Sequence, residues 1–439
     1  MKVSLKVLIL FCKDIIKTEE IKYLFITFAL MIKRIKPILI LNFIIFCFVT
    51  SLKGQNNILF SQNPKIDTND LNILYLKVDN LNFFKDNEFK AEKVSGYTLP
   101  GFRLSPKLSL ALHKNILLEA GVHMIHYWGA NKYPCYSYLD ISSWQGEQYQ
   151  KGVHLLPLLR AQISLKENLH LVFGNLYVNN NHNLIQPLYN TELNLSSDPE
   201  TGIQLIYDSK QFSSDVWVNW QSFVFRNDNH QEVFALGAST KTNLLKTDRN
   251  FQVYIPLQLI GQHRGGELDT IKSFNMHTLI NYSAGVGMSY KFNKLVKYVN
   301  FESTYSGFIN NGGVAIPFDK GYGFYNKLAL GIKDFNINFS HWVSEDFISI
   351  YGSPHFGNIS TNTSDLIFDK MQMLLAQFDY SLSLYKDASL GFEGNIIYYL
   401  PFTGDRPGYV KVVRNDVMFF SFGIYLKLNP KFRLYKFKE

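Results

Sequence analysis

The sequence alternates apolar and polar residues with a period of two along most of its length. In segment 101–112, for example, the even positions from Phe102 to Leu112 are apolar or Pro, whereas Arg103, Ser105 and Lys107 lie between them. Side chains at alternate positions of a β-strand lie on opposite faces, so this pattern predicts strands with one apolar face. Comparable strands are predicted at 153–165, 215–225, 251–262, 280–290, 299–308, 324–333, 335–342, 375–384, 388–399 and 420–428.

The connections between the predicted strands are of two kinds. Some are tight, as at 113–115, 166–168 and 385–387, and leave room only for hairpin turns. The others are long and polar, at about 130–151, 178–201, 263–277, 309–320, 348–369 and 402–414. Short turns at one end and long loops at the other are typical of outer-membrane β-barrels.

We therefore predict an all-β fold, a transmembrane antiparallel β-barrel of about 16 strands (range about 14–18), because a spanning strand needs about 9–11 residues. A soluble β-sandwich is the alternative. The polar face weighs against it, since it carries Gly, Ser, Asn and charges, as a wet lumen would. The composition agrees, with 15% aromatic and only 18% charged residues. A barrel of this size can enclose water, and no separate plug domain fits into the chain.

The N-terminal region has the pattern of a secretory leader. Lys33, Arg34 and Lys36 precede 16 uncharged residues at 37–52, and Gly54 offers a small residue for cleavage. We predict that translation starts at Met31, so that 1–30 is a mis-assigned N-terminal extension. Residues 31–54 are then a helical signal peptide. An uncleaved signal anchor is the alternative. Segment 55–95 then leads into a barrel at 96–439, in the outer membrane of the cell after cleavage.

The positive charge of the chain lies mostly in this leader. The formal net charge is +8, but residues 1–54 hold 9 Lys and Arg against 3 Asp and Glu. The remainder therefore has 35 against 33, and no basic run that would bind phosphates, so we expect no nucleic-acid partner. Cys135 is the only cysteine after the leader, and no Cys/His spacing resembles a zinc site. No metal or cofactor is predicted.

Several stretches resemble a group of porin-like outer-membrane β-barrel proteins of the Bacteroidota. They are LNFFKDNEFKAEKVSGYTLPGFRLSPKLSL at 81–110, EAGVHMIHYWGA at 119–130, VFGNLYVNNNHNLIQPLYNTE at 172–192, YDSKQFSSDVWVNWQSFVF at 207–225 and PLQLIGQHRGGELDT at 256–270. The resemblance implies a barrel in the cell envelope. It carries over no catalytic residues and leaves the substrate open.

The polar faces of the strands predict the lining of the lumen. Charges of both signs and two aromatic residues that suit stacking on sugar rings are expected there: Arg103, Lys107, Glu119, Arg160, Asp215, Trp217, Tyr254, Glu302, Lys327, Lys333, Asp379 and Glu393. A lumen with both signs of charge gives at most weak charge selectivity. This favours passage of small hydrophilic solutes.

Catalytic motifs are weak. An outer-membrane lipase needs a His and a Ser on adjacent barrel positions, with the hydroxyl activated by the imidazole. The candidate pair Ser340 and His341 places the His on the face expected to meet lipid.

Two loops could also bind a ligand. His263, Glu267 and Asp269 could meet a hard cation or a sugar, although a solvated loop is the simpler interpretation. Asn175, His182, Gln186 and Tyr189 could fold inward as a constriction or merely cover the barrel mouth.

The leading prediction is a porin-like channel for small hydrophilic solutes, without enzyme activity. Two alternatives stay open: an outer-membrane hydrolase acting on lipid or peptide, and a closed barrel that serves as an adhesin or anchors a surface complex. The expected partners are outer-membrane lipid, the barrel-assembly machinery and the solutes. The pattern leaves the oligomeric state open.

Overall fold

The computed structural model describes residues 62–438 except for 91–92, 129–153, 179–180, 226–227, 229, 246–249, 268–275, 294, 313–315, 362, 364–365, 406–411 and 415–416. The predicted extension at 1–30, the predicted signal peptide at 31–54 and Cys135 lie outside the described residues and stay predictions. Among the described residues, no helix is long and apolar enough to cross a membrane.

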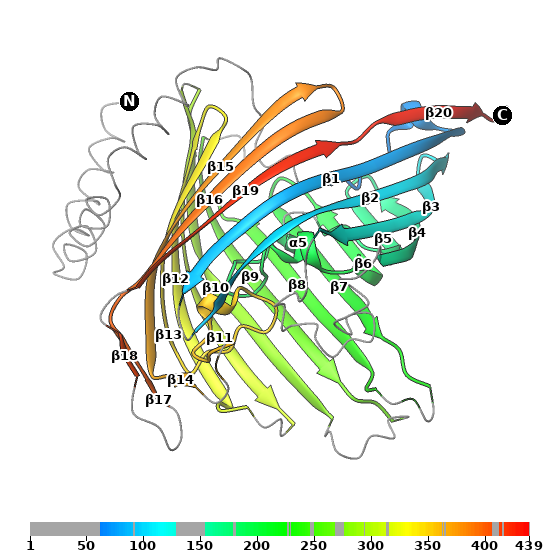
Figure 1. Ribbon diagram of the computed structural model, residues 1–439. Helices are drawn as coiled ribbons and strands as arrows, with labels where there is room; N and C mark the ends of the chain where they lie inside the picture. The colour runs from blue at the N-terminus through cyan, green and yellow to red at the C-terminus, as the bar shows by residue number, and fades with distance from the viewer. Residues whose placement is uncertain are drawn as a thin grey trace. The chain divides into compact units, whose positions relative to one another are not determined.

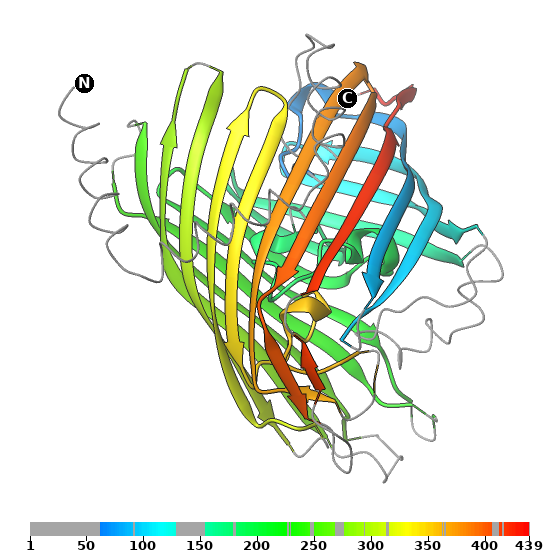
Figure 2. The same ribbon diagram turned by 60° about the vertical axis from the view of Figure 1, so that its left-hand side comes forward.

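A closed antiparallel β-barrel of 16 strands forms the body of the protein (Figure 1; Figure 2). The barrel strands are β1 (Ile73–Lys90), β2 (Ser95–His113), β3 (Ile116–Tyr127), β4 (His154–Lys166), β5 (Leu169–Asn175), β6 (Thr201–Asp208), β7 (Phe212–Ser222), β8 (Val233–Asn243), β9 (Phe251–Arg264), β10 (His277–Lys291), β11 (Val296–Asn311), β12 (Lys320–Ile332), β13 (Phe335–Glu345), β15 (Lys370–Tyr385), β16 (Ala388–Tyr399) and β19 (Val417–Leu428). Each pairs with the next strand along the chain, and β1 pairs with both β2 and β19. The predicted fold class is confirmed.

Two small additions complete the sheet structure. The strand β20 (Lys431–Lys436) follows β19 directly and pairs with the start of β1, where Ile73 lies opposite Lys436. A separate three-stranded sheet contains β14 (Ile367–Phe368), β17 (Phe402–Asp405) and β18 (Val412–Arg414).

The barrel begins earlier than the sequence pattern predicted. A boundary at residue 96 leaves out β1, which starts at Ile73 and closes the ring. The reason is a change of pattern within this strand. At its centre Leu81 and Phe83 point inward and are buried, whereas Asn80 and Asn82 lie on the outward face with the exposed Phe84. At the centre of β1 the inward face is therefore apolar and the outward face partly polar, which is the reverse of the alternation in the other strands.

Elsewhere the two faces of the strands follow the predicted alternation. On β10, Val286 is 51% exposed on the outward face, whereas Ser283 is 3% exposed on the inward face. The exposed large apolar side chains of β4, such as Leu155 and Leu159, alternate in the same way with the inward Arg160 and Gln162. An outward apolar band with a polar interior is the arrangement that a membrane-spanning barrel requires.

The two ends of the barrel differ in their connections. At one end, which we call the turn end, the strands are joined by short turns such as 114–115, 167–168 and 386–387. At the other, the loop end, long connections include 176–200 and 346–369. Short turns of outer-membrane barrels lie on the periplasmic side and long loops outside. We therefore expect the loop end to face the outside of the cell and the turn end to face the periplasm.

Two of the long connections fold into the barrel and meet there. The first, 176–200, contains η4 (Asn181–Asn183) and α5 (Leu193–Ser196), and the second, 346–369, contains η5 (Pro354–Phe356) (Figure 1). The backbone amide of Asn190 donates to the carbonyl of Tyr351 at 2.8 Å, and the Ser349 hydroxyl donates to the carbonyl of Pro187 at 2.5 Å. Apolar side chains of both segments share one hydrophobic core. We call these two segments the plug.

Side chains of the barrel wall bind the plug backbone from several directions. On β10, the Asn281 amide donates to the carbonyl of Ile348 at 2.8 Å and accepts from the amide of Ile350 at 2.9 Å. Similar bonds come from three further strands: Tyr127 on β3 to Leu195, Gln258 on β9 to Ile185, and Trp342 on β13 to Phe356. The plug is thus held across the lumen. Of the two alternatives for the loop with His182 and Gln186, the structure has the inward one.

Candidate functional site

The predicted lumen residues divide between two cavities inside the barrel. Arg103, Lys107, Glu119 and Arg160 line a cavity of about 390 Å³ beside β1–β4. We call it the charged cavity. A larger cavity of about 670 Å³ is lined by the plug, by β6–β9 and by β11–β16. This amide cavity contains six of the predicted residues: Asp215, Tyr254, Glu302, Lys327, Asp379 and Glu393.

An ion-pair network occupies the wall of the charged cavity. The buried Glu119 carboxylate lies 2.9 Å from Nη1 of Arg160, 3.4 Å from Nζ of Lys77 and 3.6 Å from Nζ of Lys107. Lys107 also pairs with Asp79 at 2.8 Å. The strand register produces this cluster, because Glu119 on β3 lies opposite Arg160 on β4 and all these side chains point inward. Each charge therefore has an opposite charge at close range.

The charged cavity also contains a hydrogen-bonded serine and histidine. Oγ of Ser105 on β2 and Nδ1 of His123 on β3 are 2.9 Å apart, and both side chains are buried. The second ring nitrogen of His123, Nε2, makes no hydrogen bond to any described residue. A hydroxyl bonded to an imidazole is the arrangement that makes serine a nucleophile. The pair satisfies the geometric requirement that Ser340 and His341 did not meet.

The positions of Ser105 and His123 in the sequence indicate that they can meet. Both residues are at inward positions, and the short turn at 114–115 sets the pairing of β2 with β3. Leu104 lies opposite Met124 and Lys107 opposite Gly121, which places Ser105 across from His123. Ser340 and His341, in contrast, are adjacent in the sequence. In the structure these point apart, because Ser340 is buried inward and His341 faces outward with Gln372 at 2.9 Å.

A second serine–histidine pair lies nearer the turn end. Oγ of Ser164 and Nδ1 of His170 are 2.9 Å apart on the β4–β5 hairpin. The side chain of Gln162 packs against this histidine and is itself bonded to the hydroxyl of Tyr177 at 2.7 Å. Ser164 and His170 line neither of the two cavities. This pair has the same contact but lies outside both cavities.

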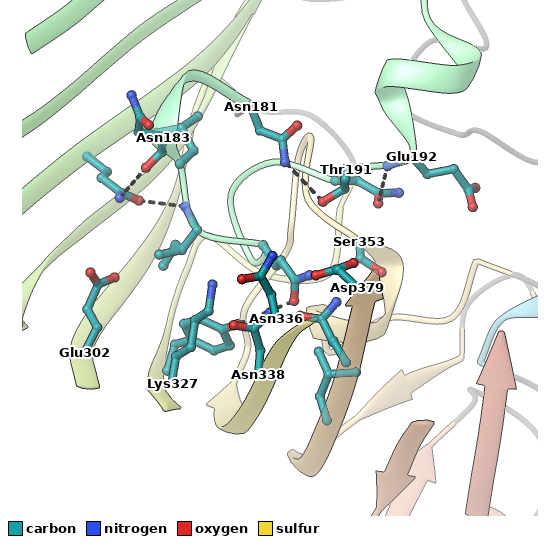
Figure 3. A pocket seen from close by; sticks show the side chains of 18 of the residues that line it. Asn181, Asn183, Thr191, Glu192, Glu302, Lys327, Asn336, Asn338, Ser353 and Asp379 are labelled. Carbon is teal, nitrogen blue, oxygen red and sulfur yellow. Dashed lines mark hydrogen bonds between the residues drawn. The ribbon is translucent and has the colours of Figure 1, made fainter. Parts of the chain in front are cut away.

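Amide side chains dominate the amide cavity, with eight asparagines and three glutamines along its walls. On the barrel wall, Asn338, Gln377 and Asn395 are paired positions on β13, β15 and β16. Figure 3 shows Asn181 and Asn183 of the plug facing this wall. Amides supply both donors and acceptors, so the cavity can bind many kinds of uncharged polar group.

Charged groups of the amide cavity gather where the plug meets β1 and β16. Nζ of Lys85 lies 3.2 Å from the Glu192 carboxylate and 2.7 Å from the Glu393 carboxylate. Asp379 occupies the paired position next to Glu393 across β15 and β16. At the other side of the cavity, the Tyr254 hydroxyl donates to Glu302 at 2.8 Å. Carboxylates outnumber lysines in this lining.

Two of the predicted lumen residues fasten the plug. The His182 ring stacks on Trp217 at 3.7 Å, and its nitrogens lie 2.8 Å from Asp215 and 3.1 Å from Glu200. Burial opposes protonation of this imidazole, but the two carboxylates prevail and raise the pKa of His182 to about 9. The buried Trp217 is therefore part of the plug contact and lies on neither cavity wall.

One predicted lumen residue lies outside the lumen, and the possible loop site stays a prediction. Lys333 is exposed in the turn after β12 with φ 51°, because the strand ends at Ile332, so it does not line the lumen. His263 faces outward on β9, where its Nδ1 lies 2.8 Å from the Thr278 hydroxyl, and Glu267 is exposed. Asp269 lies outside the described residues. Within the described ranges, no group of three or more His, Cys, Asp or Glu side chains could hold a metal ion.

Solved structures to which the chain is similar come from several bacteria. OmpT, an outer membrane protein of Vibrio cholerae, has 10% identity and a TM-score of 0.42, with 81% of this chain and 97% of that chain covered. OpdL of Pseudomonas aeruginosa has 10% identity and a TM-score of 0.43, with 82% and 98% covered. OccAB4 of Acinetobacter baumannii has 11% identity and a TM-score of 0.40, with 83% and 100% covered. No curated protein shows significant similarity to the chain.

A family model matches nearly the whole barrel, residues 66–437, and is described as lipid A 3'-O-deacylase-type. This places the protein among outer-membrane β-barrels, in agreement with the predicted location. It also points to an enzyme, so the prediction of a barrel without enzyme activity is wrong. Ser105 and His123 lie on different strands, so their contact forms no motif in the sequence. By this match the chain belongs to the lipid A 3'-O-deacylase-type family.

Proposed function

We propose that this protein is an outer-membrane hydrolase that removes an ester-linked acyl chain from a phosphorylated glycolipid of the lipid A type. The family supports the reaction class. The observation that carries the proposal is the hydrogen-bonded pair of Ser105 and His123 in the charged cavity, with Oγ and Nδ1 2.9 Å apart. This corresponds to the hydrolase alternative of the sequence analysis.

The pair supports a two-step ester hydrolysis. His123 accepts the hydroxyl proton at Nδ1 while Oγ of Ser105 attacks the acyl carbonyl carbon. The ester bond breaks, the acyl chain stays on Ser105, and the sugar alcohol leaves with the proton from His123. Water then attacks the acyl-serine with His123 again as the base, and the fatty acid is released. Proton transfer by such a base contributes about 10²–10⁴-fold to the rate.

Cationic side chains next to Ser105 fit an anionic lipid. Arg103 and Lys107 precede and follow it by two positions on the same inward face, a separation of roughly 7 Å along the strand. Arg160 lies on the same cavity wall. Arginine and lysine bind phosphate through charge-assisted hydrogen bonds. Arg103 and Lys107 would hold the phosphorylated headgroup while the acyl ester meets Ser105. Arg160 would instead support the wall, because its guanidinium donates to Glu119 and to the carbonyls of Asn175 and Leu176.

The porin-like channel is less well supported than the hydrolase. The plug lies in the lumen and is bonded to the barrel wall from several strands, which reduces the space for passage. Passage of small solutes, the Bacteroidota resemblance and the adhesin or anchor alternative stay predictions.

The test is lipid hydrolysis by the refolded protein. Full-length protein in detergent micelles is incubated with lipid A, and mass spectrometry follows the loss of an acyl chain. We expect hydrolysis by the wild type and a loss of about 100-fold or more in Ser105→Ala and in His123→Gln. The matched control is Ser164→Ala, which removes the other serine–histidine pair and should keep full activity.

Two outcomes would contradict the proposal. One is full activity in Ser105→Ala with unchanged barrel circular dichroism, which would move the chemistry to another site. The other is no hydrolysis by wild-type protein together with conductance in planar bilayers, which would return the channel to first place.

A further inference from the structure

The amide cavity contains side chains whose hydrogen-bonding capacity is not used. Among the described residues, no hydrogen bond or ion pair involves the side chains of Asn183, Asn338, Lys327 or Asp379. They come from both sides of the cavity, since Asn183 belongs to the plug and Asn338 to β13 (Figure 3). Asn183 is exposed and the other three side chains are partly exposed, so their free donors and acceptors are open to water in the cavity. Unused donors and acceptors that converge on one space are the expected feature of a site for a polar ligand.

The charge around this space favours a positive group on the ligand. Glu192 and Glu393 share Lys85, and Asp379, which lies beside Glu393, makes no ion pair with any described residue. The only other lysine near Asp379 on this wall, Lys327, makes no ion pair with any described residue. Adjacent carboxylates repel one another, so a cation placed between them is stabilised. A phosphorylated ligand would be repelled by the same groups.

The remaining lining fits a ligand that bears hydroxyl groups. Tyr254 and Tyr325 line the cavity together with Asn300, Asn336 and Gln377. Both tyrosine rings are buried, and the Tyr254 ring packs between Lys241 and Gly287, so the tyrosines offer the ligand no free ring face. The amides and carboxylates of the lining can bind the hydroxyl groups of a ligand. A volume of about 670 Å³ lies in the range of small-ligand sites.

We propose that the amide cavity binds a saccharide that bears a free amino group. The ammonium pairs with Asp379 beside Glu393, and the ring hydroxyls bond to Asn338 of the wall and Asn183 of the plug. The site is separate from Ser105 and His123, which line the charged cavity. It therefore does not depend on the proposed hydrolysis.

The experiment compares three oligosaccharides of equal length. Full-length protein in detergent is titrated calorimetrically with the tetramers of β-1,4-linked glucosamine, N-acetylglucosamine and glucose at pH 6, where the glucosamine is charged. We expect the glucosamine tetramer to bind about tenfold more tightly than the other two, because its ammonium forms a charge-assisted bond. This preference should be larger at pH 7 than at pH 6, because ionisation of the cavity carboxylates increases with pH. Asp379→Asn should remove this preference. Asp387→Asn, a change of the same kind in the β15–β16 turn, should leave it intact.

Further variants separate a binding defect from a folding defect. Asn183→Ala, a plug residue, should weaken all three tetramers by a similar factor, whereas Ser105→Ala should bind them like the wild type. The proposal is overturned if no tetramer binds, or if the three bind equally and Asn183→Ala changes nothing. An unaffected preference in a folded Asp379→Asn variant would overturn the assignment of the ammonium.

Discussion

The two cavities of one barrel are built on different principles. In the charged cavity, Glu119, Lys107 and Arg160 satisfy one another at distances of 2.9–3.6 Å. In the amide cavity, Asp379 and Asn338 face the space without a partner among the described residues. A network that is already paired holds its members in place, which suits a serine and histidine that must stay aligned. Unpaired groups can exchange water for a ligand, which suits reversible binding.

The largest expected difference between the cavities is in stability. Glu119→Gln leaves Lys77, Lys107 and Arg160 in the barrel wall without their buried carboxylate. Loss of one member of a buried ion pair costs about 3–5 kcal/mol. Glu302→Gln in the amide cavity replaces the carboxylate acceptor of Tyr254 by an amide oxygen, which can still accept the bond, and should cost far less. Denaturant unfolding in detergent measures both, and equal losses would show that the two cavities do not differ in this way.

The plug keeps the cavities apart, and its bond to Asn281 is the next test. In Asn281→Ala, the carbonyl of Ile348 and the amide of Ile350 lose their partner, and an unsatisfied buried group costs about 1–3 kcal/mol. We expect a loss of stability in this range and a higher conductance in planar bilayers than for the wild type. Ser283→Ala on the same strand and face is the control. Unchanged conductance in a destabilised Asn281→Ala would mean that the plug does not block ions.

The barrel could be predicted from the sequence because its cause is local. An inward and an outward face alternate along every strand, so residues such as Val286 and Ser283 reveal their sides without knowledge of any neighbour. Where the inward face of a strand packs against the plug, its residues are apolar and the polar–apolar alternation is lost. On β1 the inward Leu81 and Phe83 belong to the core that includes the plug, and the strand was therefore missed.

The sites depend on contacts between segments that the sequence does not pair. Ser105 and His123 meet only through the register of two strands. The position of Asn183 opposite Asn338 further requires a loop to fold inward, and period-two patterns contain no information on loops. The predicted lumen charges were mostly correct as inward residues. Their division between two cavities is a property of the plug.

The contact of His182 with the wall predicts a pH dependence. Its pKa is raised from 6.5 to about 9, so the protonated ring contributes stability that is complete below pH 6.5 and is lost as the pH rises through 9. We expect the melting temperature of the wild type to fall by a few degrees between pH 7 and pH 10. The variant His182→Gln should show a smaller fall over the same range. An identical fall in both proteins would show that another group causes the pH dependence, and that protonated His182 does not stabilise the plug.

The smallest effect is expected from Tyr254→Phe, which tests the amide cavity alone. The Tyr254 hydroxyl lies 2.8 Å from Glu302 and 3.0 Å from Asn300, and its single proton is shared between them. Its loss should cost about 1 kcal/mol, since both acceptors line the cavity and can bond to water in its place. The freed Glu302 carboxylate adds negative field, so the glucosamine tetramer should bind slightly more tightly than to the wild type, with the glucose tetramer unchanged. Calorimetric titration measures both affinities. Weaker binding of both tetramers would instead show that the hydroxyl itself contacts the sugar, and would move the ligand toward β9 and β11.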